Sequence, residues 1–148
     1  MQKLLNDFGE WIELTPAQYS ISGVKNRNER PEFYYPKFDE LISAAKSVVD
    51  CDTLCEQKLN DLITIMALDN EAENVLDYIQ RHSSCIQLEH IVKMGISHLQ
   101  REARWQIAEL VYRRKPENYT KILEQLENDS DSYVRKRASN CINLLSSN

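Results

Sequence analysis

The feature that most constrains this chain is an internal repeat with a period of about 31 residues. Residues 129–145 read as an amphipathic helix, because Asp129 and Asp131 supply capping oxygens before an apolar face. That face consists of Val134, Ala138, Cys141, Ile142 and Leu145. A shift by one period places residues 103–107 on residues 134–138, and a second shift places Ala72, Leu76 and Ile79 under Ala103, Ile107 and Leu110. Such repeats are typical of stacked helical pairs, each of which needs neighbours to bury its apolar side.

Helical periodicity continues through most of the chain and predicts an all-α protein of about eight helices. The predicted helices cover residues 2–14, 36–49, 53–67, a segment starting at residue 70 and reaching Ile79, and then 84–95, 97–114, 116–127 and 129–145. Capping boxes predict three of the starts, at Thr53 with Glu56, Asn70 with Glu73, and Ser84 with Gln87. We expect a single domain over residues 1–148, with an N-terminal capping pair in 1–51 and three helix pairs in 52–148.

Residues 15–36 show no sustained period and read as a long irregular loop. The loop ends in three aromatic residues, Phe33, Tyr34 and Tyr35. They either fold back over the exposed end of the core, as a terminal repeat requires, or belong to a binding loop.

Composition points to a cytoplasmic protein with free thiols. No apolar run approaches the roughly 20 residues that span a bilayer, and the N-terminus lacks the apolar segment of a signal peptide. The four cysteines lie among apolar residues of predicted helices, so we expect them to be reduced and buried.

The charge is unevenly distributed along the chain. Residues 39–96 contain 4 Lys/Arg and 11 Asp/Glu, a net −7, whereas residues 97–148 contain 9 and 7, a net +2. An acidic middle disfavours nucleic acid there and favours a basic partner, although such a run can also be a plain solvated face.

Motifs for catalysis and metal binding do not appear in the sequence. There is no Gly-rich phosphate loop, nucleophile elbow or helical His-Glu-x-x-His pattern. His82, Cys85, His90 and His98 are not spaced as metal ligands. We therefore expect no enzyme activity, no metal and no cofactor.

The spacing of Asp131, Val134, Arg135, Ala138 and Ile142 resembles the second-helix signature of HEAT repeats. Ala103, Arg104, Ile107 and Val111 repeat this signature, while Glu73 and Gln80 depart from it in the preceding repeat. The resemblance covers roughly residues 52–145. It implies a short right-handed α-solenoid of antiparallel helix pairs, in which Arg104 and Arg135 tie neighbouring repeats together. It further implies that Asp131 pairs with Arg104.

In HEAT-like solenoids the second helices line a concave surface, which implies a candidate partner-binding stripe. On residues 97–114 the positions opposite the predicted core face, with Leu99 counted in the core, are Arg101, Trp105, Ala108 and Tyr112. Shifts by one period add polar residues on either side, and the resulting candidate site consists of Asn74, Asp77, Arg81, Arg101, Trp105, Tyr112 and Lys136. Trp105 at the centre is either a binding hot spot or a core residue between helices.

Three functions fit this pattern. The first is a non-catalytic immunity protein that neutralises a basic toxin domain, since small acidic HEAT-like proteins are similar to bacterial immunity proteins. The second is nucleic-acid binding like that of DNA alkylation repair folds, through residues 113–115 and 135–137. The third is an adaptor or scaffold for enzyme assembly. No membrane partner is expected.

Overall fold

The computed structural model describes residues 1–12, 35–51 and 55–147, and within these ranges the protein contains eight α-helices and no strand. The prediction of an all-α protein is confirmed. The helices are α1 (Gln2–Ile12), α3 (Phe38–Val49), α4 (Glu56–Leu68), α5 (Asn74–His82), α6 (Cys85–Gly95), α7 (Arg101–Arg114), α8 (Tyr119–Glu127) and α9 (Ser132–Ser146).

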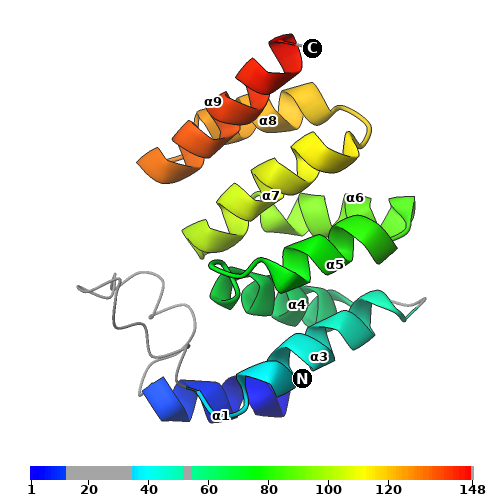
Figure 1. Cartoon of the computed structure of the whole chain (residues 1–148), viewed down its shortest axis with the longest axis vertical. Helices are drawn as coiled ribbons and strands as arrows, with labels where there is room; N and C mark the ends of the chain where they lie inside the picture. The colour runs from blue at the N-terminus through cyan, green and yellow to red at the C-terminus, as the bar shows by residue number, and fades with distance from the viewer. Residues whose placement is uncertain (13–34, 52–54, 148) are drawn as a thin grey trace.

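The helices stack along the long axis of the molecule, with α1 and α3 at one end and α8 and α9 at the other (Figure 1). Four of them, α3, α5, α7 and α9, form a layer in which each helix contacts the next. Behind this layer lie α4, α6 and α8, and α1 contacts both α3 and α4. We call the first layer the front layer and its four helices the front helices.

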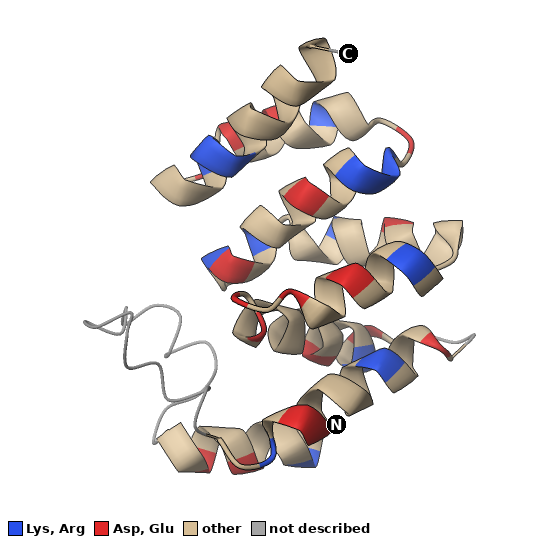
Figure 2. Cartoon of the chain, in the orientation of Figure 1, with Lys and Arg blue, Asp and Glu red and all other residues tan. Residues whose placement is uncertain are grey.

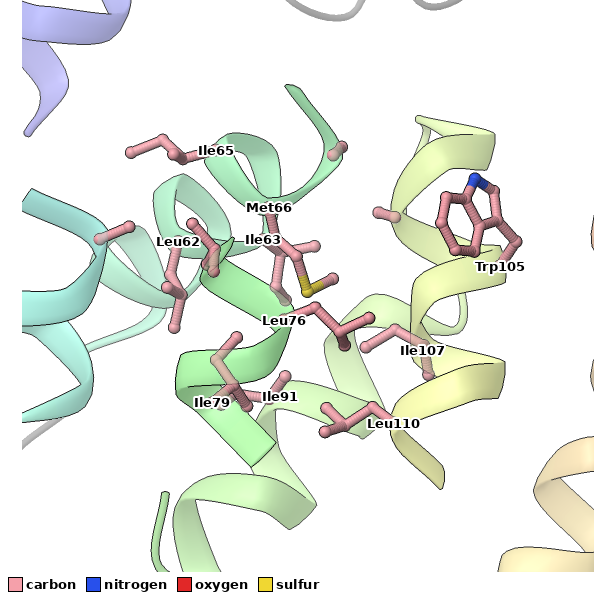
Figure 3. Packing of buried hydrophobic residues seen from close by; sticks show 14 of the residues in the cluster. Leu62, Ile63, Ile65, Met66, Leu76, Ile79, Ile91, Trp105, Ile107 and Leu110 are labelled. Atoms are coloured by element: carbon pink, nitrogen blue, oxygen red, sulfur yellow. The ribbon is translucent and has the colours of Figure 1, made fainter. Parts of the chain in front are cut away.

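The predicted core positions of α5 and α7 are buried. Leu76, Ile79, Ile107 and Leu110 point into the space between α4, α5, α6 and α7 (Figure 3). They belong to one continuous apolar cluster that reaches from Leu5 in α1 to Cys141 in α9. Burial of this apolar surface is the main stabilising term of the fold.

Two predicted core residues are exposed, because the helices that carry them start later than the periodicity suggested. Ala72 is exposed in the turn before α5, which begins at Asn74. Leu99 is 70% exposed, because α7 begins only at Arg101 and residues 97–100 form the connection from α6. These two predictions were wrong.

Capping determines where the helices begin. The capping box at Ser84 and Gln87 is confirmed, and the Asp131 carboxylate accepts hydrogen bonds from the backbone N–H groups of Tyr133 and Val134. The capping box expected at Asn70 does not form. Glu73 instead adopts a left-handed conformation with φ 54°, and α5 has no cap from that side chain. Thr53 lies outside the described residues.

A buried carboxylate replaces the expected cap of α5. Asp69, at the end of α4, accepts a hydrogen bond of 2.8 Å from the backbone N–H of Val75. Residues 69–73 therefore form a non-helical turn that leads directly into the first turn of α5. We call this segment the acidic turn, because it contains Asp69, Glu71 and Glu73.

Aromatic packing covers the N-terminal end of the core. Tyr35 is 7% exposed, and its ring lies edge-on to Phe8 and near Trp11, with centroid distances of 5.3 and 5.9 Å. This agrees with the covering role expected for the aromatic run. Phe33, Tyr34 and most of the predicted loop over 15–36 lie outside the described residues.

The repeat is visible in the hydrogen bonds of two arginines one period apart. Arg104 Nη1 donates to the carbonyl oxygens of His98 and Leu99, and Arg135 Nη1 donates to those of Asp129 and Ser130. Each guanidinium thus holds the turn that precedes its own helix. Only Arg104 also reaches an acidic side chain of the next repeat, as the resemblance implied, whereas the bonds of Arg135 to described residues stay within its own turn.

The acidic partner of Arg104 is Asp129, and the expected pairing with Asp131 is wrong. The Arg104 guanidinium donates through Nε and Nη2 to both carboxylate oxygens of Asp129, at 2.8 and 3.1 Å. Both side chains are largely buried, at 13% and 9% exposure. Asp131 caps α9 and lies near Arg101 at the start of α7, so the carboxylate two residues earlier is the one that pairs with Arg104.

We predict that Arg104→Gln lowers the free energy of unfolding by about 3 kcal/mol, because it leaves the Asp129 carboxylate buried without its cation. Arg135→Gln is the matched control, since it removes the same bonds to the preceding turn at an exposed site. It should cost less than about 1 kcal/mol. Urea unfolding followed by circular dichroism measures both, and equal losses would contradict the prediction.

Candidate functional site

The seven predicted binding residues do not form a single exposed stripe. Three of them, Asp77, Arg101 and Trp105, lie at the two joints where α7 packs against α5 and against α9. Arg81 and Lys136 are exposed, Asn74 lies beside Asp69, and Tyr112 is half-buried. The face of α7 opposite its main core therefore packs against a neighbouring helix instead of lining an open surface.

Trp105 is a packing residue of the α7–α9 joint. It is 5% exposed, and Figure 3 shows its indole on the side of α7 opposite Ile107 and Leu110. The Arg137 guanidinium lies 4.4 Å from the centre of the Trp105 ring, and the Tyr133 ring meets it edge-on. Of the two alternatives for Trp105, the structure shows the packing position between helices, because α9 covers the indole.

Charge pairing closes the same joint. Arg137 lies 2.8 Å from the Glu109 carboxylate and donates to the Tyr133 hydroxyl. Tyr112, the other predicted aromatic, is half-buried and packs against the core. Neither aromatic of α7 presents a free ring to a partner.

On α9 the residues one period after this packing face are polar and exposed or half-exposed. Lys136 stands where Trp105 stands on α7, and Ser139 and Asn143 follow Ala108 and Tyr112. The polar character of this outer surface suits contact with water.

The α5–α7 joint is ionic. Arg113 on α7 lies 3.1 Å from the Glu73 carboxylate and 3.0 Å from that of Asp77. Asp77 is also 3.5 Å from the exposed Arg81, while Asn74 donates to Asp69. Of the predicted residues on α5, Asp77 thus holds two helices together, whereas Arg81 remains largely exposed.

Arg101 lies at a small hollow where the acidic turn faces the starts of α7 and α9. Its guanidinium contacts Glu102 at 3.1 Å and Asp131 at 3.6 Å. The hollow has a volume of about 230 Å³ and is lined mainly by charged groups from three elements. The structure brings Arg101 and Trp105 together here, as lining residues of one site.

A larger hollow of about 540 Å³ lies between α3 and the acidic turn. We call it the α3–α5 groove, and its lining residues are Tyr35, Pro36, Phe38, Asp39, Ile42, Ser43, Lys46, Asp69, Ala72 and Asn74. Figure 2 shows acidic residues gathered over the turn between α4 and α5, and basic residues at both ends of α7.

Sequence reasoning missed this groove, because it assigned residues 70–73 to a helix. The Asp69-Asn70 pair between two apolar segments is a turn signal that would have located it. The carboxyl group of Asp69 is 2% exposed, and burial raises its pKa above the ordinary value, against the hydrogen bonds from Val75 and Asn74.

The thiols are free but not all buried. Cys51, Cys55 and Cys85 are exposed, which corrects the expectation of burial for these three, and Cys141 is buried. The exposed three lie at helix ends, where the neighbouring helices do not cover them. Burial raises the pKa of the Cys141 thiol to about 12.

Among the described residues, no three His, Cys, Asp or Glu side chains come together as ligands for a metal ion. No described helix is long and apolar enough to cross a membrane. No family model matches this sequence, and no curated protein or solved structure is significantly similar to it.

We predict that Trp105→Ala lowers the free energy of unfolding by about 3 kcal/mol, the usual range for removing a buried aromatic. Trp105→Phe should cost less, because it keeps a ring under the Arg137 guanidinium. Both values come from urea unfolding. A fully stable Trp105→Ala protein would mean that the indole is not part of the α7–α9 joint.

His98 should make stability depend on pH. Its Nδ1 accepts from the Gln100 backbone N–H, so the neutral ring carries its proton on Nε2, beside the Thr64 hydroxyl. Burial, with a smaller contribution from Arg104, lowers the pKa of His98 from 6.5 to about 4. Because the unfolded chain binds this proton at a higher pH than the folded protein does, the free energy of unfolding falls as the pH drops from about 6.5 to about 4. The total loss is about 3 kcal/mol.

His98→Gln should flatten stability over that pH range, and His90→Gln, at an exposed site, should not. Urea midpoints between pH 7 and pH 4.5 measure the effect. An unchanged pH slope in His98→Gln would contradict the assignment.

Proposed function

We propose that this protein is a non-catalytic protein-binding module, most specifically an immunity protein that holds a basic toxin domain. The binding surface would lie on residues 39–96, which we call the acidic half. The observation that carries the proposal is the α3–α5 groove, a hollow of about 540 Å³ beside the acidic turn. Around it, residues 39–96 carry a net charge of −7, which would accelerate association with a basic protein. The proposal includes a cytoplasmic location.

The proposal treats the helix stack as a short HEAT-like solenoid. Support comes from the repeated hydrogen bonds of Arg104 and Arg135, one period apart, and from the side-by-side order of α3, α5, α7 and α9. In a stack of this kind, charged residues hold neighbouring helices in place. A partner binds the extended surface that successive helices form together.

The use of the arginines favours a protein partner over nucleic acid. Arg113, Arg114 and Arg137 all bond to groups of this chain, and Arg135 bonds to two of its own carbonyl oxygens. Guanidinium groups engaged in this way are poorly placed to neutralise phosphates. Lys115 and Lys136 remain exposed, and two lysines are few cations for binding the phosphates of a duplex backbone.

The test is capture of a partner from lysate of the source cells by the immobilised chain, with and without nuclease treatment. We expect a basic protein that is retained after nuclease treatment and forms a 1:1 complex. Recovery of nucleic acid that disappears with nuclease would support the second candidate function instead.

Charge steering gives the accompanying prediction. In the captured complex, Glu40→Lys with Asp50→Lys should slow association about tenfold at low salt, since both carboxylates are exposed, one on α3 and one at its C-terminal end. Glu117→Lys with Glu124→Lys makes the same change in net charge near α8 and should slow it less than about twofold. Surface plasmon resonance measures both rates, and equal effects would contradict the assignment of the acidic half as the binding surface.

A further inference from the structure

The α3–α5 groove has the chemistry of a receptor for one cationic side chain. We propose that it receives an arginine of the basic protein partner, whose guanidinium enters between Asp39 and Asp69. This inference rests on the proposed function and specifies which part of the acidic half makes the central contact.

The groove has the size and the walls that such a side chain needs. One wall is the first half of α3, with Phe38 half-buried and Ile42 buried, and the opposite wall is the acidic turn with Ala72. The apolar side chains in these walls suit the aliphatic stem of a long cationic side chain, while the polar groups beside them suit its charged end.

Asp69 supplies a buried carboxylate that makes no direct ion pair with a described residue, although the charge of Lys46 acts on it from a longer distance. It is 2% exposed and accepts hydrogen bonds from the Val75 backbone and the Asn74 side chain, yet it forms no ion pair with any described residue. A carboxylate that is hydrogen-bonded but not neutralised gains most from a cation brought into the same low-dielectric space. Asp39 lies exposed in the lining of the same groove and adds a second negative charge.

The chain's own lysine in the groove lies towards one side of it. Lys46 Nζ lies 5.4 Å from the centre of the Tyr78 ring, and Tyr78 in turn donates to the Asp50 carboxylate. The Lys46 ammonium thus lies over the middle of α5, where its charge also acts on Asp69 without a direct ion pair. Among the described lining residues Lys46 is the only cation, so the proposed guest cation is placed beside Phe38 and Asp39.

Arginine fits this site better than lysine. Its planar guanidinium can pack against the Phe38 ring and donate two parallel hydrogen bonds to one carboxylate. An ammonium is a compact, strongly hydrated charge that loses more water on entry and cannot form the paired bonds.

The test uses the full ¹⁵N-labelled chain and N-acetyl-arginine amide as the probe, followed by NMR at about 150 mM salt, where diffuse attraction is screened. We expect shift changes that cluster at Asp39, Ser43 and Asn74. Asp39→Asn should raise Kd at least about threefold, and Glu40→Gln, the neighbouring exposed carboxylate outside the groove, should leave it within about 1.5-fold.

Two further measurements make the test specific. N-acetyl-lysine amide should bind at least about threefold more weakly. Asp69→Asn keeps an oxygen acceptor for Val75 but removes the charge, so it should weaken binding of the probe while circular dichroism shows the helices intact. Shift changes spread evenly over the acidic residues, or equal losses in Asp39→Asn and Glu40→Gln, would overturn the inference.

The partner complex separates this inference from the proposed function. If the captured protein binds Asp39→Asn and Asp69→Asn as tightly as wild type, the groove assignment is wrong and the protein-binding function stands. If the groove binds the arginine probe but lysate yields no protein partner, the proposed function is wrong and the inferred protein occupant fails with it.

Discussion

The arrangement of the front layer depends on buried or half-buried guanidinium groups that each join two elements. Arg104 bonds to the turn before its own helix and to the Asp129 carboxylate, which follows α8. Arg113 links α7 to the carboxylate of Glu73, just before α5. Arginine suits this role because one planar group can donate several hydrogen bonds in fixed directions. Each pair costs desolvation energy, so its main contribution is to define how adjacent helices sit, while the apolar cluster supplies most of the stability.

This constraint has a consequence for function. Side chains that look like binding residues on an isolated helix are engaged within the stack, as Trp105 is by Arg137 and Tyr133 and as Asp77 is by Arg113. The hollows that we assign to a partner under the proposed function lie at the N-terminal ends of the front helices. The acidic turn separates two of them, and it exists because Asp69 caps α5 from the end of the preceding helix.

The electrostatic character of those hollows follows from the same turn. Around Arg101 the charges are already paired within the chain, so that hollow offers little net attraction. In the α3–α5 groove the Asp69 carboxylate has hydrogen bonds but no direct ion pair with a described residue, and Phe38, Ile42 and Ala72 lie in the same lining. Under the proposed function, the groove is therefore where a basic partner would gain most from a paired charge.

The sequence by itself determined the helices, the period and the local capping at Ser84 and Asp131, because these depend on neighbours within a few residues. It also indicated the structural role of Arg104, although the matching Arg135 is exposed and bonds only to the turn before its own helix. The side of α7 that carries Trp105 was settled only by the tertiary structure. Periodicity identifies one buried face, whereas a helix inside a stack has neighbours on several sides. For the same reason, the periodicity did not predict that Arg104 pairs with Asp129 instead of Asp131, or that a groove lies beside Asp69. Both features depend on which turn packs against which helix.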